Sequence, residues 1–251
     1  MADTKENTPP QGHIHPMSQV IREMHDIFRD IGFTLASGPE IETEYYNFDA
    51  LNVPADHPAR DMWDTFWLKP LSARKLLRTH TSPVQIRYME NKVKSGGEPP
   101  IKIIAPGKTY RHEATDATHE AQFYQLEGLY VGKDVSMADL KSTLEYFFGK
   151  FLGAGTDADG TLAKAEIRFR PSFFPFVEPG VEVDVKFRGK WLEVMGAGMV
   201  HPSVLSGVGI NPEHYKGFAF GMGIDRLVMI KYGIPDVRFL YNGDLRLVNQ
   251  F

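Results

Sequence analysis

The chain has 251 residues, 42% of them hydrophobic, so it can bury a core without disulfides. It contains no cysteine, which excludes thiolate zinc sites and thiol catalysis. No segment approaches about 18 consecutive apolar residues and the first residues lack a targeting pattern, so no membrane contact and a cytosolic location are expected. A net charge of −4 makes the chain a poor autonomous nucleic-acid binder, because non-specific affinity comes mainly from neutralising phosphates.

Residues 1–12 are polar, contain two adjacent prolines and are predicted to form a disordered leader. A helix is expected to begin near His15 and Pro16 and to end before Gly32, a residue type common just past a helix. Its apolar residues recur at spacings of three and four. This pattern predicts an amphipathic helix that packs against a core or a partner.

Three further helices are predicted from N-cap residues, a possible capping box and terminal glycines. They are expected to run from Ser82 to about Ser95, from Ser136 to about Gly153, and from about Ile224 to Tyr232. Short β-rich runs lie between them, at residues 102–105, 167–170, 182–187 and 191–197. Because the strands cluster without a regular βαβ alternation, we expect an α+β fold built on an antiparallel sheet.

The densest polar segment is residues 107–128, GKTYRHEATDATHEAQFYQLEG. Residues 110–113 and 122–129 are predicted strands of a hairpin, and its Arg111, Glu113, Gln125 and Glu127 share one strand parity. A guanidinium beside several acceptors is suited to a zwitterion or a phosphate. Ordinary ion pairs on a surface hairpin fit the same residues, and the segment alone does not separate the two interpretations.

Familiar nucleotide-binding loops are missing, since neither GxxxxGK[ST] nor GxGxxG follows a predicted strand. Instead, a predicted strand at residues 217–223, which contains several glycines, is followed by a predicted helix with Arg226 in its first turn. Such glycines allow the backbone to approach a ligand closely, and they equally allow tight packing of helix on sheet.

Six segments together resemble a known family. They are FDALNVPADHPARDMWDTFWL, LLRTHTSPVQIR, the 107–128 hairpin, FRPSFFPFVEPGVEVDV, GAGMVHPSVL and GFAFGMGIDRLVMIKYGIPDVR. Together these segments are similar to the α chains of phenylalanyl-tRNA synthetase, a class II aminoacyl-tRNA synthetase. The resemblance covers residues 13–251, which are therefore expected to form one catalytic domain. It implies a class II antiparallel sheet flanked by helices.

The resemblance also implies a reaction, in which L-phenylalanine and ATP form an adenylate and tRNA(Phe) then receives the phenylalanyl group. Arg111 is expected to bridge the carboxylate and the α-phosphate, Arg226 to contact the nucleotide, and Phe123 to stack on adenine. Glu113 and His119 are further expected ATP-binding residues. Glu178 matches the family's Mg²⁺ carboxylate, although an exposed Glu before Pro is an ordinary surface feature.

The phenylalanine site is also implied by matching positions. The ammonium group is expected to meet His80, Ser82, Glu113, Gln125 and Glu127. The ring is expected in a slot formed by Phe174, Phe176, Val177, Ala219 and Gly221, with Ala219 limiting its depth at the para position. The two phenylalanines also fit ordinary core packing.

Partners follow from the same resemblance. The chain starts at the catalytic domain, without the amino-terminal coiled coil usual in bacterial α chains, so a larger β chain is expected to supply editing and most tRNA contacts in an (αβ)₂ assembly. The first helix and the segment after it are candidate interface elements. A truncated or reduced, self-dimerising enzyme, a core that forms only the adenylate, and a non-aminoacylating binding module remain alternatives.

Overall fold

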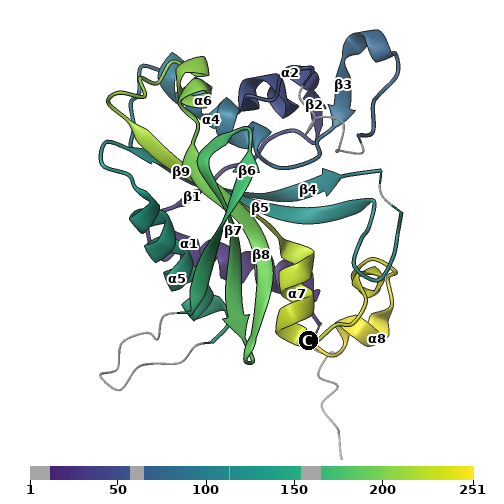
Figure 1. Ribbon diagram of the computed structural model, residues 1–251. Coiled ribbons are helices and arrows are strands. Elements are labelled where there is room, and N and C mark those ends of the chain that lie inside the picture. Colours follow the sequence, from purple (N-terminus) through teal and green to yellow (C-terminus); the bar gives the residue numbers. More distant parts are fainter. Residues whose placement is uncertain (1–11, 57–64, 113, 154–164) are drawn as a thin grey trace, which may run out of the picture.

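The computed structural model describes residues 12–56, 65–112, 114–153 and 165–251 (Figure 1). Seven strands of the described chain form one sheet in the order β1-β4-β5-β9-β8-β7-β6. They are β1 (Thr34–Leu35), β4 (Ile101–Tyr110), β5 (Gln122–Gly132), β9 (Lys216–Gly223), β8 (Lys190–Val200), β7 (Val177–Phe187) and β6 (Ile167–Phe174). Every neighbouring pair is antiparallel except β1 with β4, so the predicted α+β antiparallel sheet is confirmed.

A second, two-stranded sheet pairs β2 with β3 antiparallel, beside the helices at the top of Figure 1. Its strands are β2 (Ile41–Thr43) and β3 (Lys75–Leu77). The remaining short elements are α2 (Glu44–Asn47), η1 (Asp49–Leu51), η2 (Leu71–Ala73), η3 (Val237–Leu240) and α8 (Leu245–Val248). No helix in the described ranges is long and apolar enough to cross a membrane.

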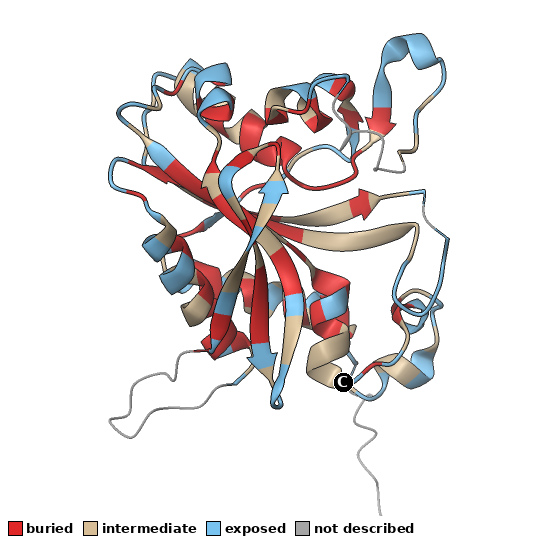
Figure 2. Cartoon of the chain, in the orientation of Figure 1, coloured by how far each residue is buried: buried red, intermediate tan, exposed pale blue. Residues whose placement is uncertain are grey.

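Helices lie on both sides of the large sheet and divide the core in two (Figures 1 and 2). One cluster of buried side chains joins the sheet to α1 (Pro16–Asp30), α5 (Met137–Phe151) and α7 (Ile224–Tyr232). The other joins it to α4 (Pro83–Lys94) and α6 (Pro202–Gly207). Strand alternation assigns side chains to the two clusters: Ile104 belongs to the first, and its neighbours Ile103 and Ala105 to the second.

The first helix forms where it is predicted, and Gly32 follows it with a φ of +86°. Its apolar stripe is buried inside its own chain, with Val20, Met24 and Phe28 fully buried. The Phe28 ring stacks on Phe147 of α5 with centroids 4.7 Å apart. This stripe is therefore occupied by the chain's own core and is not available to a partner.

The other helix signals are confirmed with one difference in detail. Ser136 and Asp139 form the predicted capping box of α5, and Gly233 ends α7 with a φ of +70°. Ser82 does precede α4, but it makes no capping hydrogen bond because its hydroxyl is bonded elsewhere, to Glu127.

The polar hairpin forms, but β4 ends at Tyr110 and does not continue to residue 113 as predicted. Arg111 nevertheless stays paired, since its N–H donates to the carbonyl of Ala121 at 3.0 Å. The register places Gly107 opposite Gln125 and Ala105 opposite Glu127. Glu113 and residues 1–11 of the predicted leader lie outside the described residues.

Candidate active site

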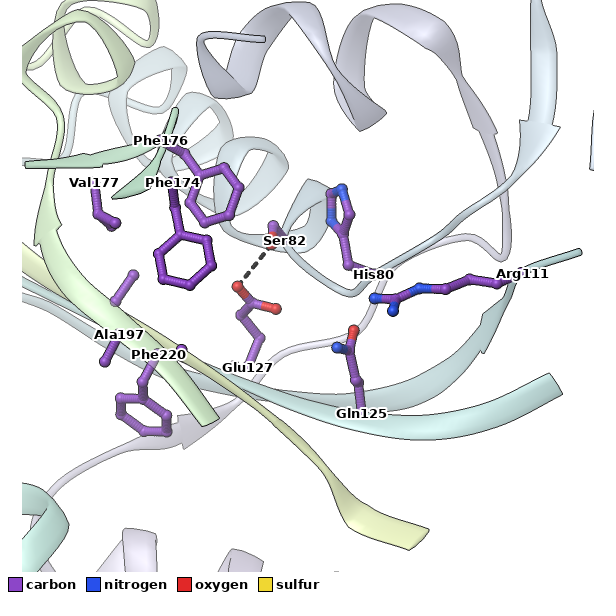
Figure 3. Close-up of a pocket in the computed structure, with 13 residues that line it drawn as sticks. His80, Ser82, Arg111, Gln125, Glu127, Phe174, Phe176, Val177, Ala197 and Phe220 are labelled. Atoms are coloured by element: carbon purple, nitrogen blue, oxygen red, sulfur yellow. Dashed lines mark hydrogen bonds between the residues drawn. The ribbon is translucent and has the colours of Figure 1, made fainter. Parts of the chain in front are cut away.

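A cavity of about 280 Å³ opens on the α4 side of the sheet, where β5, β8 and β9 meet the loop before α4 and the turn between β6 and β7 (Figure 3). Its lining includes nine of the predicted phenylalanine-binding residues together with Arg111. These are His80, Ser82, Gln125, Glu127, Phe174, Phe176, Val177, Ala219 and Gly221. Segments more than a hundred residues apart in the sequence therefore converge as the resemblance predicts, although the role of each residue stays a prediction.

A carboxyl group lies buried in the middle of this cavity. Glu127 is 5% exposed and accepts hydrogen bonds from Ser82 Oγ at 2.6 Å, Gln85 Nε2 at 2.9 Å and Thr81 Oγ1 at 3.2 Å. Burial raises the pKa of Glu127 to about 7, against the opposing effect of the two hydroxyl donors. A cationic ligand group placed beside this carboxyl would favour its charged form.

Two further polar groups border the same space. Burial, and then the neighbouring Arg111 guanidinium, lower the pKa of His80 to about 3, so its imidazole is neutral near pH 7. Gln125 Oε1 is buried, and no group in the described ranges donates a hydrogen bond to it. Because an unpaired buried acceptor is costly, this oxygen is suited to accept from a ligand N–H.

Arg111 lies at one end of the cavity. Its Nε donates to the carbonyl of Thr79 at 3.1 Å, and its guanidinium carbon lies 5.0 Å from the centroid of the Phe123 ring. In Figure 3 its terminal nitrogens point toward Gln125 and the cavity. The site thus presents a positive group at one end and a titratable carboxyl further in.

The opposite end is apolar. The rings of Phe174 and Phe176 lie at an interplanar angle of 20° with centroids 6.0 Å apart. Val177 and Ala219 complete this wall, and Ala219 is 6% exposed. A planar apolar group that reaches this end would contact aromatic faces and small side chains, which is the geometry an aromatic amino acid requires.

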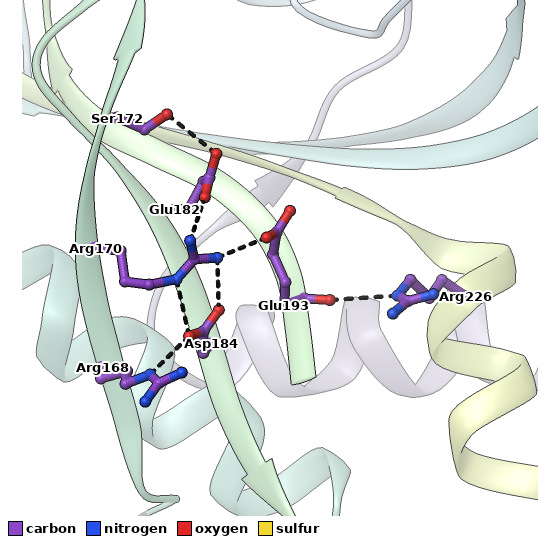
Figure 4. Close-up of polar contacts among 7 residues, drawn as sticks. All are labelled: Arg168, Arg170, Ser172, Glu182, Asp184, Glu193 and Arg226. Carbon is purple, nitrogen blue, oxygen red and sulfur yellow. Dashed lines mark hydrogen bonds and ion pairs between the residues drawn. The ribbon is translucent and has the colours of Figure 1, made fainter. Parts of the chain in front are cut away.

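A second cavity of about 500 Å³ adjoins the first and shares Phe174, Gly196 and Gly221 with it. Arg226 lines it from α7, with Glu182 and Glu193 from β7 and β8. Arg226 Nε donates to the carbonyl of Glu193 at 3.3 Å (Figure 4). The guanidinium is suited to a phosphate, whereas the two carboxylates would repel one unless a cation lay between them.

A network of ion pairs holds the carboxylates of this second cavity. Arg170 lies among Glu182, Asp184 and Glu193, at 2.8, 3.0 and 2.6 Å (Figure 4). Arg168 also pairs with Asp184, at 2.7 Å, and Arg170 lowers the pKa of that carboxyl. The network keeps the side chains of β6, β7 and β8 ordered along the open face of the sheet.

Three predicted residues of the described ranges line neither cavity, namely Phe123 beside Arg111, Glu178 and His119. Glu178 is exposed, pairs with His201 Nε2 at 3.3 Å and lines a third hollow, which shares Phe174 and Val177 with the first cavity. His119 bonds to Asp116 within the exposed loop of the hairpin, at 3.0 Å. Within the described ranges, no group of three or more metal-ligating side chains is present.

Several residues of the site, in the cavity linings or bonded to them, were missed by the sequence reasoning. Thr81 and Gln85 bond Glu127, Ala197 lines the first cavity, and Glu182 and Glu193 line the second. The sequence could have indicated the two glutamates, because side chains at positions of like parity on neighbouring strands face the same side of a sheet.

Comparison with known proteins is consistent with this geometry. A family model described as tRNA synthetases class II core domain (F) matches residues 2–251. The chain belongs to the class II tRNA synthetase family. It shares 52% identity over 242 residues with the phenylalanine--tRNA ligase alpha subunit of Synechocystis sp., covering 96% of this chain and 68% of that one. It also shares 52% identity over 252 residues with the phenylalanine--tRNA ligase alpha subunit of Geobacillus kaustophilus, covering 96% of this chain and 69% of that one.

The class II fold is also found in a solved structure. Pyrrolysyl-tRNA synthetase from Desulfitobacterium hafniense superposes with a TM-score of 0.68 at 20% identity, covering 96% of this chain and 76% of that chain. At this identity the likeness concerns the fold alone. The predicted class II synthetase architecture and the resemblance to phenylalanyl-tRNA synthetase α chains are thus both confirmed.

Proposed function

We propose that this chain is the catalytic α chain of a phenylalanine–tRNA ligase, which forms phenylalanyl-adenylate from L-phenylalanine and ATP and transfers the phenylalanyl group to tRNA(Phe). One observation carries the proposal: a single cavity holds Arg111 at one end, Glu127 in the middle and an aromatic wall at the other. The names of the relatives point to the same reaction, and they favour an enzyme over a binding module.

The order of these groups matches the order of groups in phenylalanine. The substrate carboxylate meets the Arg111 guanidinium, the ammonium group meets Glu127 and the Gln125 oxygen, and the phenyl ring enters the slot beside Phe174 and Phe176. Each aromatic pair adds about 0.5–1.5 kcal/mol beyond area burial when its geometry is favourable. Ala219 closes the slot, so the fit depends on the size of the ring.

Adenylation then joins the two cavities. A carboxylate oxygen of phenylalanine attacks the α-phosphorus of ATP, the bond to the β-phosphate oxygen breaks, and pyrophosphate leaves with the electron pair. Arg111 contacts both reacting groups, which aligns them and stabilises the charge that develops on phosphate oxygens. Arg226 binds the outer phosphates, and Phe123 stacks on adenine.

Magnesium is the metal that the family implies, and when bound with ATP it would neutralise phosphate charge. Glu182 and Glu193 line the cavity that holds Arg226, and they would hold the ion if they exchanged their ion pairs with Arg170 for it. Glu178, the position predicted from the motif, is exposed and lines a hollow that shares Phe174 and Val177 with the first cavity, so it stays a candidate ligand beside them.

A β chain and tRNA complete the proposal. An apolar slot discriminates against one added hydroxyl by only about 10²-fold, so tyrosine would be a recurrent error that needs a second, hydrolytic site. The relatives are named alpha subunits, which supports a partner β chain. We propose that this β chain is larger and supplies editing and tRNA contacts in an (αβ)₂ assembly. Self-dimerisation of the chain is the alternative assembly.

The decisive test is phenylalanine-dependent ATP–pyrophosphate exchange, followed by charging of tRNA(Phe), each run with and without a β chain. Arg111→Ala should lower the exchange rate by about 10²–10³-fold, because it removes a preorganised charge from the reacting groups. Arg246→Ala is the matched control, since Arg246 is exposed and bonds only to neighbouring residues in the described structure.

The outcomes separate the candidates. Exchange without charging, in the presence of the β chain, would identify a core that forms only the adenylate. A folded chain without exchange in either condition would contradict the enzyme proposal and leave a binding module.

A further inference from the structure

Asn47 ends α2 (Glu44–Asn47) and is completely buried, yet it lines neither cavity. Its side-chain amide bonds twice to one residue: Nδ2 donates to Thr79 Oγ1 at 3.0 Å, and Oδ1 accepts from the Thr79 N–H at 3.3 Å. Thr79 is itself fully buried. The amide thus holds both the side chain and the backbone of Thr79 in one orientation.

The remaining backbone group of Thr79 faces Arg111. Its carbonyl accepts from Arg111 Nε at 3.1 Å, and in Figure 3 the terminal nitrogens of Arg111 point into the cavity. A planar guanidinium held at Nε has a defined direction for its terminal N–H groups. Asn47 therefore influences the aim of Arg111 through one intervening residue.

The same loop supplies two other cavity residues. His80 and Ser82 follow Thr79 and line the cavity, and Arg78 precedes it and donates to the carbonyls of Gly38 and Lys108 at 3.1 and 2.7 Å. Arg78 fixes one end of the loop, and Asn47 fixes its middle. A shift at Thr79 would move Arg111 relative to the phenylalanine-binding groups.

We propose that Asn47 is a positioning residue for adenylation, which acts through Thr79 to set the angle at which Arg111 meets the substrate carboxylate and the α-phosphate. The inference rests on the proposed function. A purely structural buried hydrogen bond contributes to stability and nothing specific to turnover. A positioning contact has a larger effect on rate, because a misplacement of about 1 Å can cost about 10²-fold.

The test measures pyrophosphate exchange by wild type and variants in the assembly in which the wild-type chain is active, together with thermal unfolding of each variant. Asn47→Ala and Thr79→Val should each lower kcat by about 10- to 10²-fold at temperatures well below their unfolding. Thr79→Ser keeps the hydroxyl and should retain near wild-type kcat. Tyr46→Phe is the matched control: it removes a bond from the same helix to Glu90, away from the cavities, and should leave kcat unchanged.

An Arg111→Lys background provides the decisive comparison, because lysine cannot make the Nε bond to Thr79. If Asn47 acts through Arg111, adding Asn47→Ala there should lower kcat by less than about twofold. An equal loss in both backgrounds, or a wild-type kcat for a folded Asn47→Ala variant, would overturn the inference while leaving the proposed function intact. Absence of exchange in the wild-type assembly would overturn both.

Discussion

Replacing Glu127 by Gln should stabilise the ligand-free chain and weaken its binding of phenylalanine. Burial raises the pKa of this carboxyl from 4.5 to about 7. A difference of that size between the unfolded and folded states corresponds to about 3 kcal/mol of unfolding free energy lost when the group is charged. Gln keeps the shape and carries no charge, so Glu127→Gln should recover up to about this amount.

The pH dependence has a definite sign. Below pH 4.5 the carboxyl is neutral in both states, and its burial has no charge cost. Between 4.5 and about 7 the unfolded chain releases the proton while the folded chain keeps it, so stability falls as pH rises through this window. Above about 7 the loss is complete, and the advantage of Glu127→Gln should be largest there.

Urea unfolding at about pH 5 and pH 8 measures this difference, with the exposed Glu213→Gln as a control for the loss of one carboxylate. Phenylalanine binding should instead favour the charged form of Glu127, because the substrate ammonium pairs with a carboxylate. KM for phenylalanine in pyrophosphate exchange should rise about tenfold per pH unit below about 7 in the wild type, and should be high and independent of pH in Glu127→Gln. An equal stability difference at both pH values, or a wild-type KM in the variant, would refute this reasoning.

Three other substitutions test the slot and the core. Ala219→Gly should deepen the slot and admit para-substituted phenylalanines; an unchanged ratio of exchange rates for para-chlorophenylalanine and phenylalanine would contradict this. Gly196→Ala should raise KM for phenylalanine, because the added methyl would lie 2.9 Å from the Phe174 ring, whereas Gly207→Ala meets nothing within 4 Å and should not. Phe28→Ala should lower the unfolding free energy by about 3–5 kcal/mol, measured in urea, because the ring is fully buried; a loss below about 1 kcal/mol would contradict the packing described for α1.

The elements that could be predicted from the sequence carry local signals. The stripe of α1, the capping box of α5 and the glycine after α7 depend on neighbouring residues, and all three are confirmed. Ser82 shows the limit of this reasoning. A serine before proline predicts an N-cap, but its hydroxyl bonds Glu127 because a buried carboxyl 45 residues away needs a donor.

The candidate site required the family resemblance, because its contacts are long-range. Glu127 accepts from residues 42 to 46 positions away, and Asn47 bonds Thr79 across 32 positions. No periodicity in the sequence indicates these pairs. Motif matching named nine of the residues that line the first cavity, and it also named Glu178, which pairs with His201 at the neighbouring hollow; the roles of all of them stay predictions.

The glycines that bound the polar hairpin explain why its composition alone could not be interpreted. A Cβ on Gly107 would lie 2.2 Å from Nη2 of Arg78, and one on Gly128 would lie 2.1 Å from the ring of Phe220. Both positions are filled by a side chain from another segment, so the glycines are required by packing and not by a turn. Arg78 fills the space over Gly107 on the sheet face of Gln125, and Phe220 fills the space over Gly128 on the other face. The residues that make the segment look like a reaction site and the residues that shape it therefore come from different parts of the chain.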